Sequence, residues 1–225
     1  MLMLSLDSSA ITASACLTND DEVLKSEFLN AGLTHSETLL PLVESVMEGY
    51  GYSELDAIAV NAGPGSFTGV RIGIATVKGL AFSFNTPCVA VSALHSVACN
   101  FLGENAVVCA VMDARRGQFY NALFEVRGNS VERLCPDRAI SAEDLKKELG
   151  QFQSVIIAGD GAKLCYESVG LLNTVLADRD KIFQNAVGVS RAAKGKELIS
   201  EKNLFPIYLR PSQAERELKL KREKK

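Results

Sequence analysis

The sequence contains an internal repeat, and this repeat limits the possible folds more than any other feature. The segment LSLDSSAITASACL at residues 4–17 aligns with AVMDARRGQFYNAL at residues 110–123. The alignment places Asp7 and Asp113 at equivalent points, 106 residues apart. One match of this kind could be chance. A true duplication also requires that the predicted helices and strands follow in the same order in both halves. A repeat with agreeing elements predicts two similar lobes, each burying its own apolar face.

The hydrophobic pattern predicts the same order of elements in both halves: three strands, a helix, a strand, a helix, a strand and a helix. In the first half, strands are expected at 3–6, 11–18, 23–29, 57–61 and 88–91, and helices at 35–50, 69–84 and 93–102. In the second half, strands are expected at 107–112, 117–126, 130–135, 155–158 and 174–176, and helices at 142–149, 162–169 and 186–202.

This duplicated β-β-β-α-β-α-β-α order is similar to the layout of actin, Hsp70 and the sugar kinases, a ribonuclease H-like α/β architecture. Mixed sheets covered by helices on both faces are therefore expected. The first lobe should span residues 1–104 and the second residues 105–204, with the tail 205–225 returning to the first lobe. Proteins of this layout bind ATP between the lobes, but the fold alone does not establish a function.

Helix starts carry N-cap signals. Thr34-His-Ser-Glu37 matches a capping box, in which the Thr hydroxyl and the Glu carboxylate satisfy free backbone N–H groups. Ser141 and Asn185 occupy N-cap positions before two helices of the second half. Pro41 removes a backbone donor, so it is expected to kink the first helix.

Composition excludes several classes of protein. The chain has 225 residues, with 24 Lys and Arg against 27 Asp and Glu, a net charge of −3. This charge disfavours nucleic-acid binding by a broad basic surface. The longest apolar run, 106–112, is too short to span a membrane, and the first residues lack the pattern of a signal peptide. A cytoplasmic protein with no membrane partner is expected.

The most distinctive segment is NAGPGSFTGVRIG, from Asn61 to Gly73. Its glycines do not have the spacing of the dinucleotide fingerprint, and it lacks the Gly-Lys-Ser/Thr of a P-loop. Phe67 stands at the position where a nucleophile elbow has Ser. Two interpretations remain: an anion cradle at a helix N-terminus, or a tight turn whose glycines allow close packing.

Candidate catalytic groups are few. Asp7 and Asp113 both end strands and would face a cleft between the lobes. In kinases of this layout a glycine-bearing turn follows the first Asp, whereas here Ser-Ser-Ala follows. A Mg-ATP site and a polar turn that caps the hairpin both remain open. The two histidines, His35 and His95, lie 60 residues apart and do not form H-E-x-x-H, so no zinc-protease site is predicted.

Five segments together resemble the bacterial TsaB (YeaZ) family over essentially the whole length. They are LSLDSSA, THSETLLP, NAGPGSFTGVRIG, AVMDARRGQFYNAL and YLRPSQAERE. The resemblance implies a non-catalytic paralogue of TsaD, the subunit that transfers threonylcarbamoyl to adenosine 37 of tRNA. In that catalytic relative, an H-x-x-x-H motif holds a metal. The corresponding positions here are Ala93 and Val97.

The resemblance further implies a heterodimer with TsaD, the ATPase TsaE as a third component, and contact with tRNA only through the complex. ATP would be used by the complex, with no cofactor in the isolated chain and no catalytic or metal-binding residue. An alternative is an enzyme of the same fold, either an ATP-dependent phosphotransferase or a metallopeptidase.

A partner surface is expected on the first two helices. One side of the helix 69–84 carries Arg71, Ala75, Lys78 and Phe82, while Leu40 and Met47 widen the apolar stripe of the preceding helix. We hypothesise one patch, used for TsaD or, without TsaD, for homodimerisation. In the alternative, the C-terminal segment or the other helix of the same chain covers these residues. The basic tail after Ser212 is either a solvated end or an arm that reaches a partner or RNA.

Overall fold

A five-stranded mixed sheet forms the centre of the first lobe. The computed structural model describes residues 1–32 and 34–210. The strands are β1 (Leu2–Asp7), β2 (Ala13–Asn19), β3 (Glu22–Leu29), β4 (Ala57–Gly63) and β5 (Cys88–Ser92). Their order is β3-β2-β1-β4-β5, with β1–β2–β3 antiparallel and β1–β4–β5 parallel. The parallel centre is buried on both faces, which explains why every residue of β4 is buried and why four apolar residues begin it.

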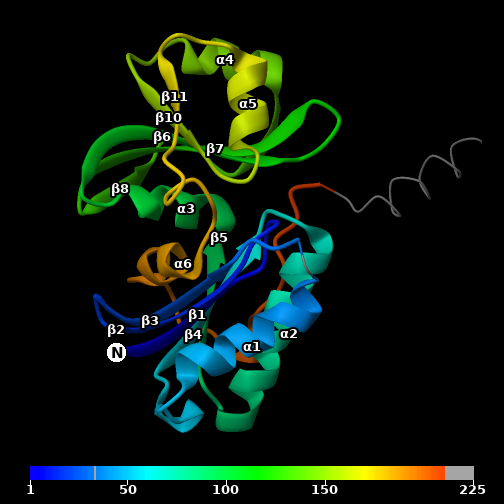
Figure 1. The fold of residues 1–225 in the computed structure, drawn as a ribbon, viewed down its shortest axis with the longest axis vertical. Helices are drawn as coiled ribbons and strands as arrows, with labels where there is room; N and C mark the ends of the chain where they lie inside the picture. The colour runs from blue at the N-terminus through cyan, green and yellow to red at the C-terminus, as the bar shows by residue number, and fades with distance from the viewer. Residues whose placement is uncertain (33, 211–225) are drawn as a thin grey trace, which may run out of the picture.

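Two long helices cover one face of this sheet (Figure 1). They are α1 (His35–Met47) and α2 (Phe67–Phe84). Their apolar sides and the strands beneath them form one core cluster, in which Val43 and Val77 are fully buried. Pro41 lies within α1. A short 3-10 turn, η1 (Tyr52–Glu54), connects α1 to β4.

The second lobe repeats this arrangement. Its sheet contains β6 (Glu104–Asp113), β7 (Gln118–Gly128), β8 (Ser130–Arg133), β10 (Val155–Ala158) and β11 (Thr174–Leu176). The order is β8-β7-β6-β10-β11, which matches the first sheet strand for strand. Helices α4 (Ala142–Leu149) and α5 (Ala162–Val169) cover its outer face. The predicted duplicated fold is confirmed.

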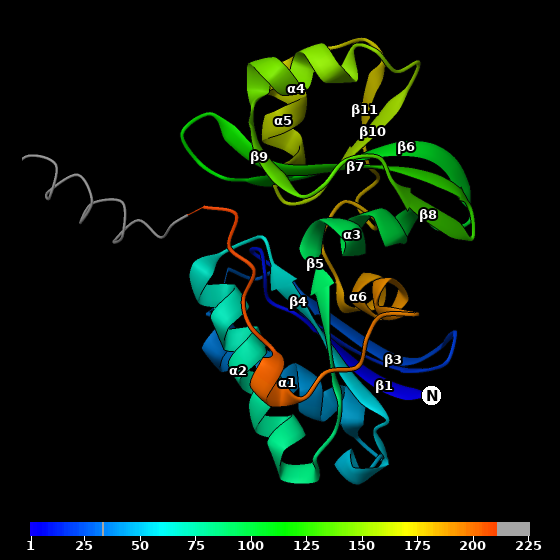
Figure 2. The same ribbon diagram turned by 180° about the vertical axis from the view of Figure 1, so that it is seen from behind.

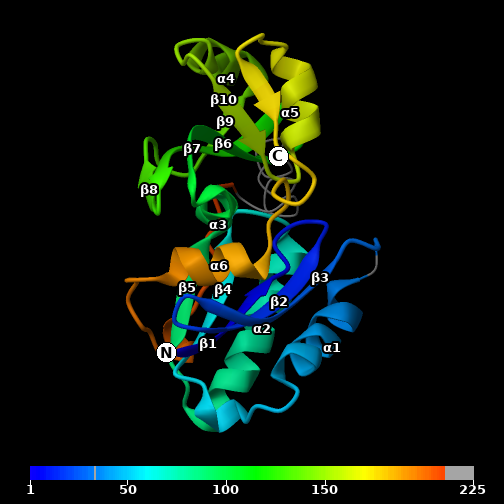
Figure 3. The same ribbon diagram turned by 60° about the vertical axis from the view of Figure 1, so that its left-hand side comes forward.

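The third helix of each lobe lies between the two sheets (Figures 2 and 3). These helices are α3 (Ala93–Ala98), extended by η2 (Cys99–Phe101), and α6 (Ala186–Ala193). Each helix packs on the sheet of the other half: Leu94 and Val97 join the core of the second sheet, and Val189 joins that of the first. The lobes are therefore connected through exchanged helices as well as through the chain.

Several local predictions were wrong. A further strand, β9 (Arg138–Ser141), pairs with β7 and was not predicted. The final helix ends at Ala193 instead of about residue 202, because Gly195 (φ +69°) turns the chain and Ile199 then pairs with Cys88. Ser141 and Asn185 cap their helices as predicted, through Asp144 N and Gly188 N.

The capping box at the start of α1 is not formed. Within the described residues the side chain of Thr34 makes no cap hydrogen bond, although its carbonyl oxygen accepts from Glu37 N at 3.0 Å. The helix starts at His35 as expected, so the start was predicted correctly and the bonding was not.

The chain returns to the first lobe after α6. A 3-10 turn, η3 (Glu201–Asn203), leads to a segment, 205–210, that runs along α2 toward the second lobe (Figure 2). Residue 33 and the tail 211–225, including its basic residues, lie outside the described residues. In the part of the chain that is described, no helix combines the length and the apolar character needed to cross a membrane.

Candidate functional site

The turn that follows β1 is the point where most of the distinctive sequence segments meet. It consists of Asp7, Ser8, Ser9 and Ala10. Asp7 Oδ1 accepts hydrogen bonds from Ser9 Oγ at 2.6 Å, Ser9 N at 3.1 Å and Asn61 Nδ2 at 2.7 Å. The carboxylate thus caps its own hairpin turn, as one of the two predicted alternatives expected.

Asp7 is fully buried, and this limits its chemistry. Burial raises the pKa of its carboxyl group, and the hydrogen bonds from Ser9 and Asn61 only partly oppose the shift. Its second oxygen, Oδ2, and Asn61 Oδ1 have no hydrogen-bond partner among the described residues. A carboxyl group without exposed surface cannot reach a metal–phosphate ligand in the cleft unless the turn first moves.

The glycine-rich segment packs directly against this turn. A β-carbon at Gly65 would lie 2.3 Å from Ser9 O, and one at Gly69 would lie 2.0 Å from Ser8 O. Ser66 N donates to Ser9 O at 2.8 Å, and Ser8 Oγ donates to Gly69 O at 2.9 Å. Because these groups bond to the protein itself, the geometry favours the close-packing interpretation over an anion cradle.

His35, from the THSETLLP segment, contacts the same turn. Its Nε2 lies 2.8 Å from Ala10 O, and its Cδ2 lies against Gly69. The sequence identified His35 as an N-terminal helix residue but not as a contact of the 7–10 turn. Only the relative placement of α1 and the hairpin reveals it, because the two segments are 25 residues apart.

A cavity of about 640 Å³ lies between the lobes beside this turn. Ser9 and Thr68 line it from the first lobe, and Asp113, Arg115 and Asp160 line it from the second. Burial and the negative charges of Asp7 and Asp113 raise the pKa of Asp160 to about 6. A hydrogen bond from Gln184 acts in the opposite direction and lowers it. Asp113 is exposed, so the repeat-related aspartates differ: one faces the cavity and the other does not.

The positions where the catalytic relative is expected to carry metal-binding histidines are apolar and buried. Ala93 and Val97 pack in the core under the second sheet. His95, between them, stacks on Phe124 with ring centroids 5.6 Å apart, and burial and neighbouring cations lower its pKa to about 4. Among residues 1–32 and 34–210, no three His, Cys, Asp or Glu side chains converge as a metal site.

The predicted partner surface is only partly open. Phe82 and Leu40 are exposed at 75% and 46%, and Ala75 is also exposed. Met47, by contrast, is 3% exposed and belongs to the core of the first lobe, so its assignment to the surface was wrong.

The C-terminal segment contacts the two cations of this surface, although Arg71 stays exposed and Lys78 is half-buried. Arg71 Nε donates to the Tyr208 hydroxyl at 2.7 Å, and Lys78 Nζ lies 4.7 Å from the centroid of the Phe205 ring. The alternative in which the chain's own C-terminal segment covers the patch therefore holds only in part, for Lys78. Ala75, Phe82 and Leu40 stay exposed.

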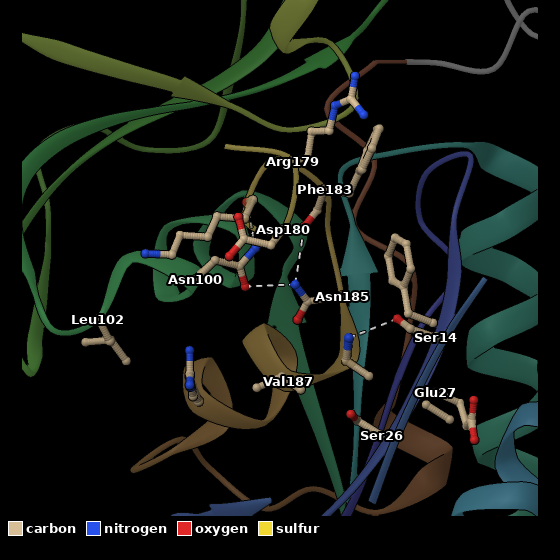
Figure 4. A pocket seen from close by; sticks show the side chains of 15 residues that line it. Ser14, Ser26, Glu27, Asn100, Leu102, Arg179, Asp180, Phe183, Asn185 and Val187 are labelled. Carbon is tan, nitrogen blue, oxygen red and sulfur yellow. Dashed lines mark hydrogen bonds between the residues drawn. The ribbon is translucent and has the colours of Figure 1, made fainter. Parts of the chain in front are cut away.

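A second cavity, of about 620 Å³, lies between β3 and the start of α6 (Figure 4). Sequence analysis did not predict this cavity, because its walls come from four separate segments. Two hydrogen bonds join the segments that line it: Asn185 Nδ2 donates to Asn100 Oδ1 at 3.0 Å, and Ala186 N donates to Ser14 Oγ at 2.9 Å. This bonding indicates a structural joint between α6 and the first sheet.

Comparison with known proteins gives consistent similarities along the whole chain. The family model described as TsaD, tRNA N6-adenosine threonylcarbamoyltransferase, matches residues 30–207. The tRNA threonylcarbamoyladenosine biosynthesis protein TsaB of Bacillus subtilis is 30% identical, covering 96% of both chains. TsaB of Escherichia coli is 29% identical, covering 97% of this chain and 98% of the relative.

The solved structure of YeaZ from Pseudomonas aeruginosa has a similar fold. It superposes with a TM-score of 0.77 at 27% identity, covering 92% of this chain and 99% of the other.

Proposed function

The chain belongs to the TsaB family of tRNA threonylcarbamoyladenosine biosynthesis proteins, and on this premise we propose that it is a non-catalytic, activating subunit. In this proposal it binds the TsaD-type transferase, which installs threonylcarbamoyl on adenosine 37 of tRNA. The ATPase TsaE joins as a third component in the cytoplasm, ATP is used by the complex, and tRNA is bound through the complex.

The observation that carries the non-catalytic role is the closed turn at Asp7. In the enzymes of this layout, the turn after the first strand holds phosphates. Here Gly65 and Gly69 press against Ser8 and Ser9, and the Asp7 carboxylate is turned inward. The backbone groups of the turn and one oxygen of Asp7 bond to the protein itself, and this supports a structural role for the turn.

The proposed docking surface is the exposed part of α1 and α2. Leu40, Ala75 and Phe82 leave apolar surface open on two adjacent helices (Figure 1). Exposed apolar residues gathered on one face are typical of protein–protein contacts. A paralogous partner presents the equivalent helices, so one surface can serve both a homodimer and the heterodimer, in alternation.

Reconstitution tests the function directly. The assay combines purified TsaD-type transferase, TsaE, threonylcarbamoyl donor, ATP and unmodified tRNA. It is run with and without this chain, and the modified adenosine is quantified. We expect modification to require the chain, and the chain alone to modify nothing. Equal modification without the chain would refute the proposal. Turnover by the chain alone, abolished by Asp7→Ala, would favour a phosphotransferase instead.

A further inference from the structure

The segment 205–210, which we call the strap, is attached to both lobes. It follows Leu204, which is fully buried in the core of the first lobe. From there it runs along α2 toward the second lobe (Figure 2). At its other end, Leu209 packs against the core of the second lobe, and Arg210 Nη1 donates to Ala114 O at 3.0 Å. The strap therefore connects the lobes a second time, apart from the exchanged helices.

Two side chains of the strap contact opposite walls of the cavity between the lobes. Phe67 lines this cavity from the first lobe and Ala114 lines it from the second. The Tyr208 ring stacks on Phe67, with ring centroids 4.5 Å apart, while Arg210 bonds to Ala114. The exchanged helices α3 and α6 connect the lobes on the other side of the molecule (Figures 1 and 2). A rotation of the lobes about α3 and α6 would therefore pull on the strap.

The strap is also bonded to the side of α2 that carries the proposed docking surface. Arg71 Nε donates to the Tyr208 hydroxyl at 2.7 Å. The same guanidinium lies over both stacked rings, 5.9 Å from the centroid of Phe67 and 5.5 Å from that of Tyr208. Arg71 lies about one helical turn before Ala75. A molecule bound at Ala75 is thus one side chain away from the strap.

The strap can open without unfolding of either lobe. Its side chains Phe205, Ile207 and Tyr208 are exposed at 63%, 46% and 42%. Its backbone is bonded to the first sheet through Ile207 N, which donates to Ala62 O at 2.7 Å. Segments with exposed side chains and few buried contacts open at a lower free energy than the whole domain. The strap therefore has two states, attached and released.

We propose that the strap is a latch that holds the lobes closed beside the cavity and couples this closure to the surface of α2. When Leu209 and Arg210 leave the second lobe, the lobes turn about α3 and α6 and the cavity widens. A molecule that binds one of the two states more tightly shifts the balance between them, whether it binds on α2 or in the cavity. The coupling is reciprocal, so closure of the lobes changes the affinity of α2 for its partner. Only this last consequence rests on the proposed function.

Hydrogen exchange of the isolated chain, measured by mass spectrometry, tests the latch. Leu209→Ala combined with Arg210→Ala removes the attachment to the second lobe, and Arg71→Ala removes the bond to α2. The reporter is the hairpin tip 114–118 of the second lobe, in which Ala114 N donates to Gln118 O at 3.0 Å. The matched control is Arg127→Ala, which removes an exposed arginine near the far end of β7.

We expect exchange at the tip to become about tenfold faster in the double variant. In Arg71→Ala it should become about two- to fivefold faster, because the loss of one hydrogen bond favours opening by a factor of this size. Helices α4 and α5, which lie on the outer face of the second sheet, should exchange as in wild type. The control should match wild type throughout.

An unchanged tip in the double variant would overturn the latch. An unchanged tip in Arg71→Ala would overturn its coupling to α2, since Arg71 belongs to the first lobe and the tip to the second. Equally faster exchange in α4 and α5, or a faster tip in the control, would overturn the proposal by showing a general loss of stability. No partner is present in this experiment. A chain that proves dispensable for tRNA modification therefore refutes the proposed function and leaves the latch standing.

Discussion

Two glycines of α2 face very different surroundings, and substitution separates their roles. A β-carbon at Gly69 would lie 2.0 Å from the carbonyl oxygen of Ser8, whereas one at Gly79 would meet nothing within 4 Å. Gly69→Ala should lower the free energy of unfolding by about 1–3 kcal/mol, because the buried turn must move. Gly79→Ala should raise it by about 0.5–1 kcal/mol, through higher helix propensity. Urea unfolding of both variants measures the contrast, and equal effects would contradict the packing argument.

Asp160 makes the stability depend on pH. Its pKa is about 6 in the folded protein, because of burial and the neighbouring aspartates, against 3.8 as its ordinary value. The native state therefore holds a proton that the unfolded state has released between about pH 4 and 6. Over this window the contribution of Asp160 to stability falls as pH rises.

Asp160→Asn should remove this dependence. The stability of the variant relative to wild type should increase by about 1–3 kcal/mol from pH 4 to pH 6 and stay level above pH 6. Taking the difference between the two proteins cancels the other titrating groups. A relative stability that is constant with pH would show that Asp160 titrates normally.

At the scale of single residues, the sequence predicted those roles in which a side chain bonds to residues close to it along the chain. It gave a hairpin-capping turn as one role of Asp7, since Ser9 is two residues away. It could not predict the contact of His35 with Ala10, because this contact depends on how α1 packs against the hairpin. Likewise, the spacing of the glycines left two interpretations open, and only the proximity of Ser8 and Ser9 distinguishes them.

At the scale of elements, two helix N-caps can be compared: the side chain of Ser141 forms its capping hydrogen bond at the start of α4, and the side chain of Thr34 forms none at the start of α1. Ser141 Oγ accepts from Asp144 N at 3.1 Å, whereas the side chain of Thr34 makes no cap bond within the described residues. Ser141→Ala should cost about 1 kcal/mol, and Thr34→Ala distinctly less. Thermal unfolding of the two variants tests this. A larger loss for Thr34→Ala would mean that the capping box predicted from sequence forms in solution.

The elements that were predicted correctly are those with strong periodicity and local boundaries. Ser141 and Asn185 fixed two helix starts, and the apolar runs of β4 and β10 located the parallel strands. The strand β9 escaped prediction, because its four residues are stabilised by pairing with β7 and not by a pattern of their own. The early end of α6 follows from a tertiary contact, since Ile199 pairs with Cys88.

At the scale of the whole molecule, the repeat predicted two matching lobes but not their exchange of helices. α3 packs on the second sheet and α6 packs on the first. Thr18 Oγ1 and Ser190 Oγ, 3.0 Å apart, also link β2 to α6. A sequence repeat specifies which elements recur but not which sheet each helix packs on, because that depends on tertiary contacts. The exchange ties the lobes together and suits a subunit that presents a fixed surface to a partner.

The surface itself is tested by placing a charge on α2. Ala75 is exposed on the side of α2 that also carries the exposed ring of Phe82, beside Arg71 and Lys78, which contact the C-terminal segment. Ala75→Glu leaves the fold intact, because the position faces solvent, but introduces a bulky carboxylate into any close contact between helices. An unpaired charge buried at an interface is costly. Both self-association and binding to the TsaD-type partner should weaken at least tenfold.

Ala139→Glu, at an exposed alanine of β9 in the second lobe, is the matched control. It adds the same charge outside the proposed surface and should behave as wild type. Sedimentation equilibrium measures self-association, and pull-down with the purified transferase measures the heterodimer. If one helix face serves both contacts, the two affinities fall together. A folded Ala75→Glu protein that still dimerises and still binds the transferase would place the interface elsewhere. Loss of only one contact would show that the homodimer and the heterodimer use different surfaces.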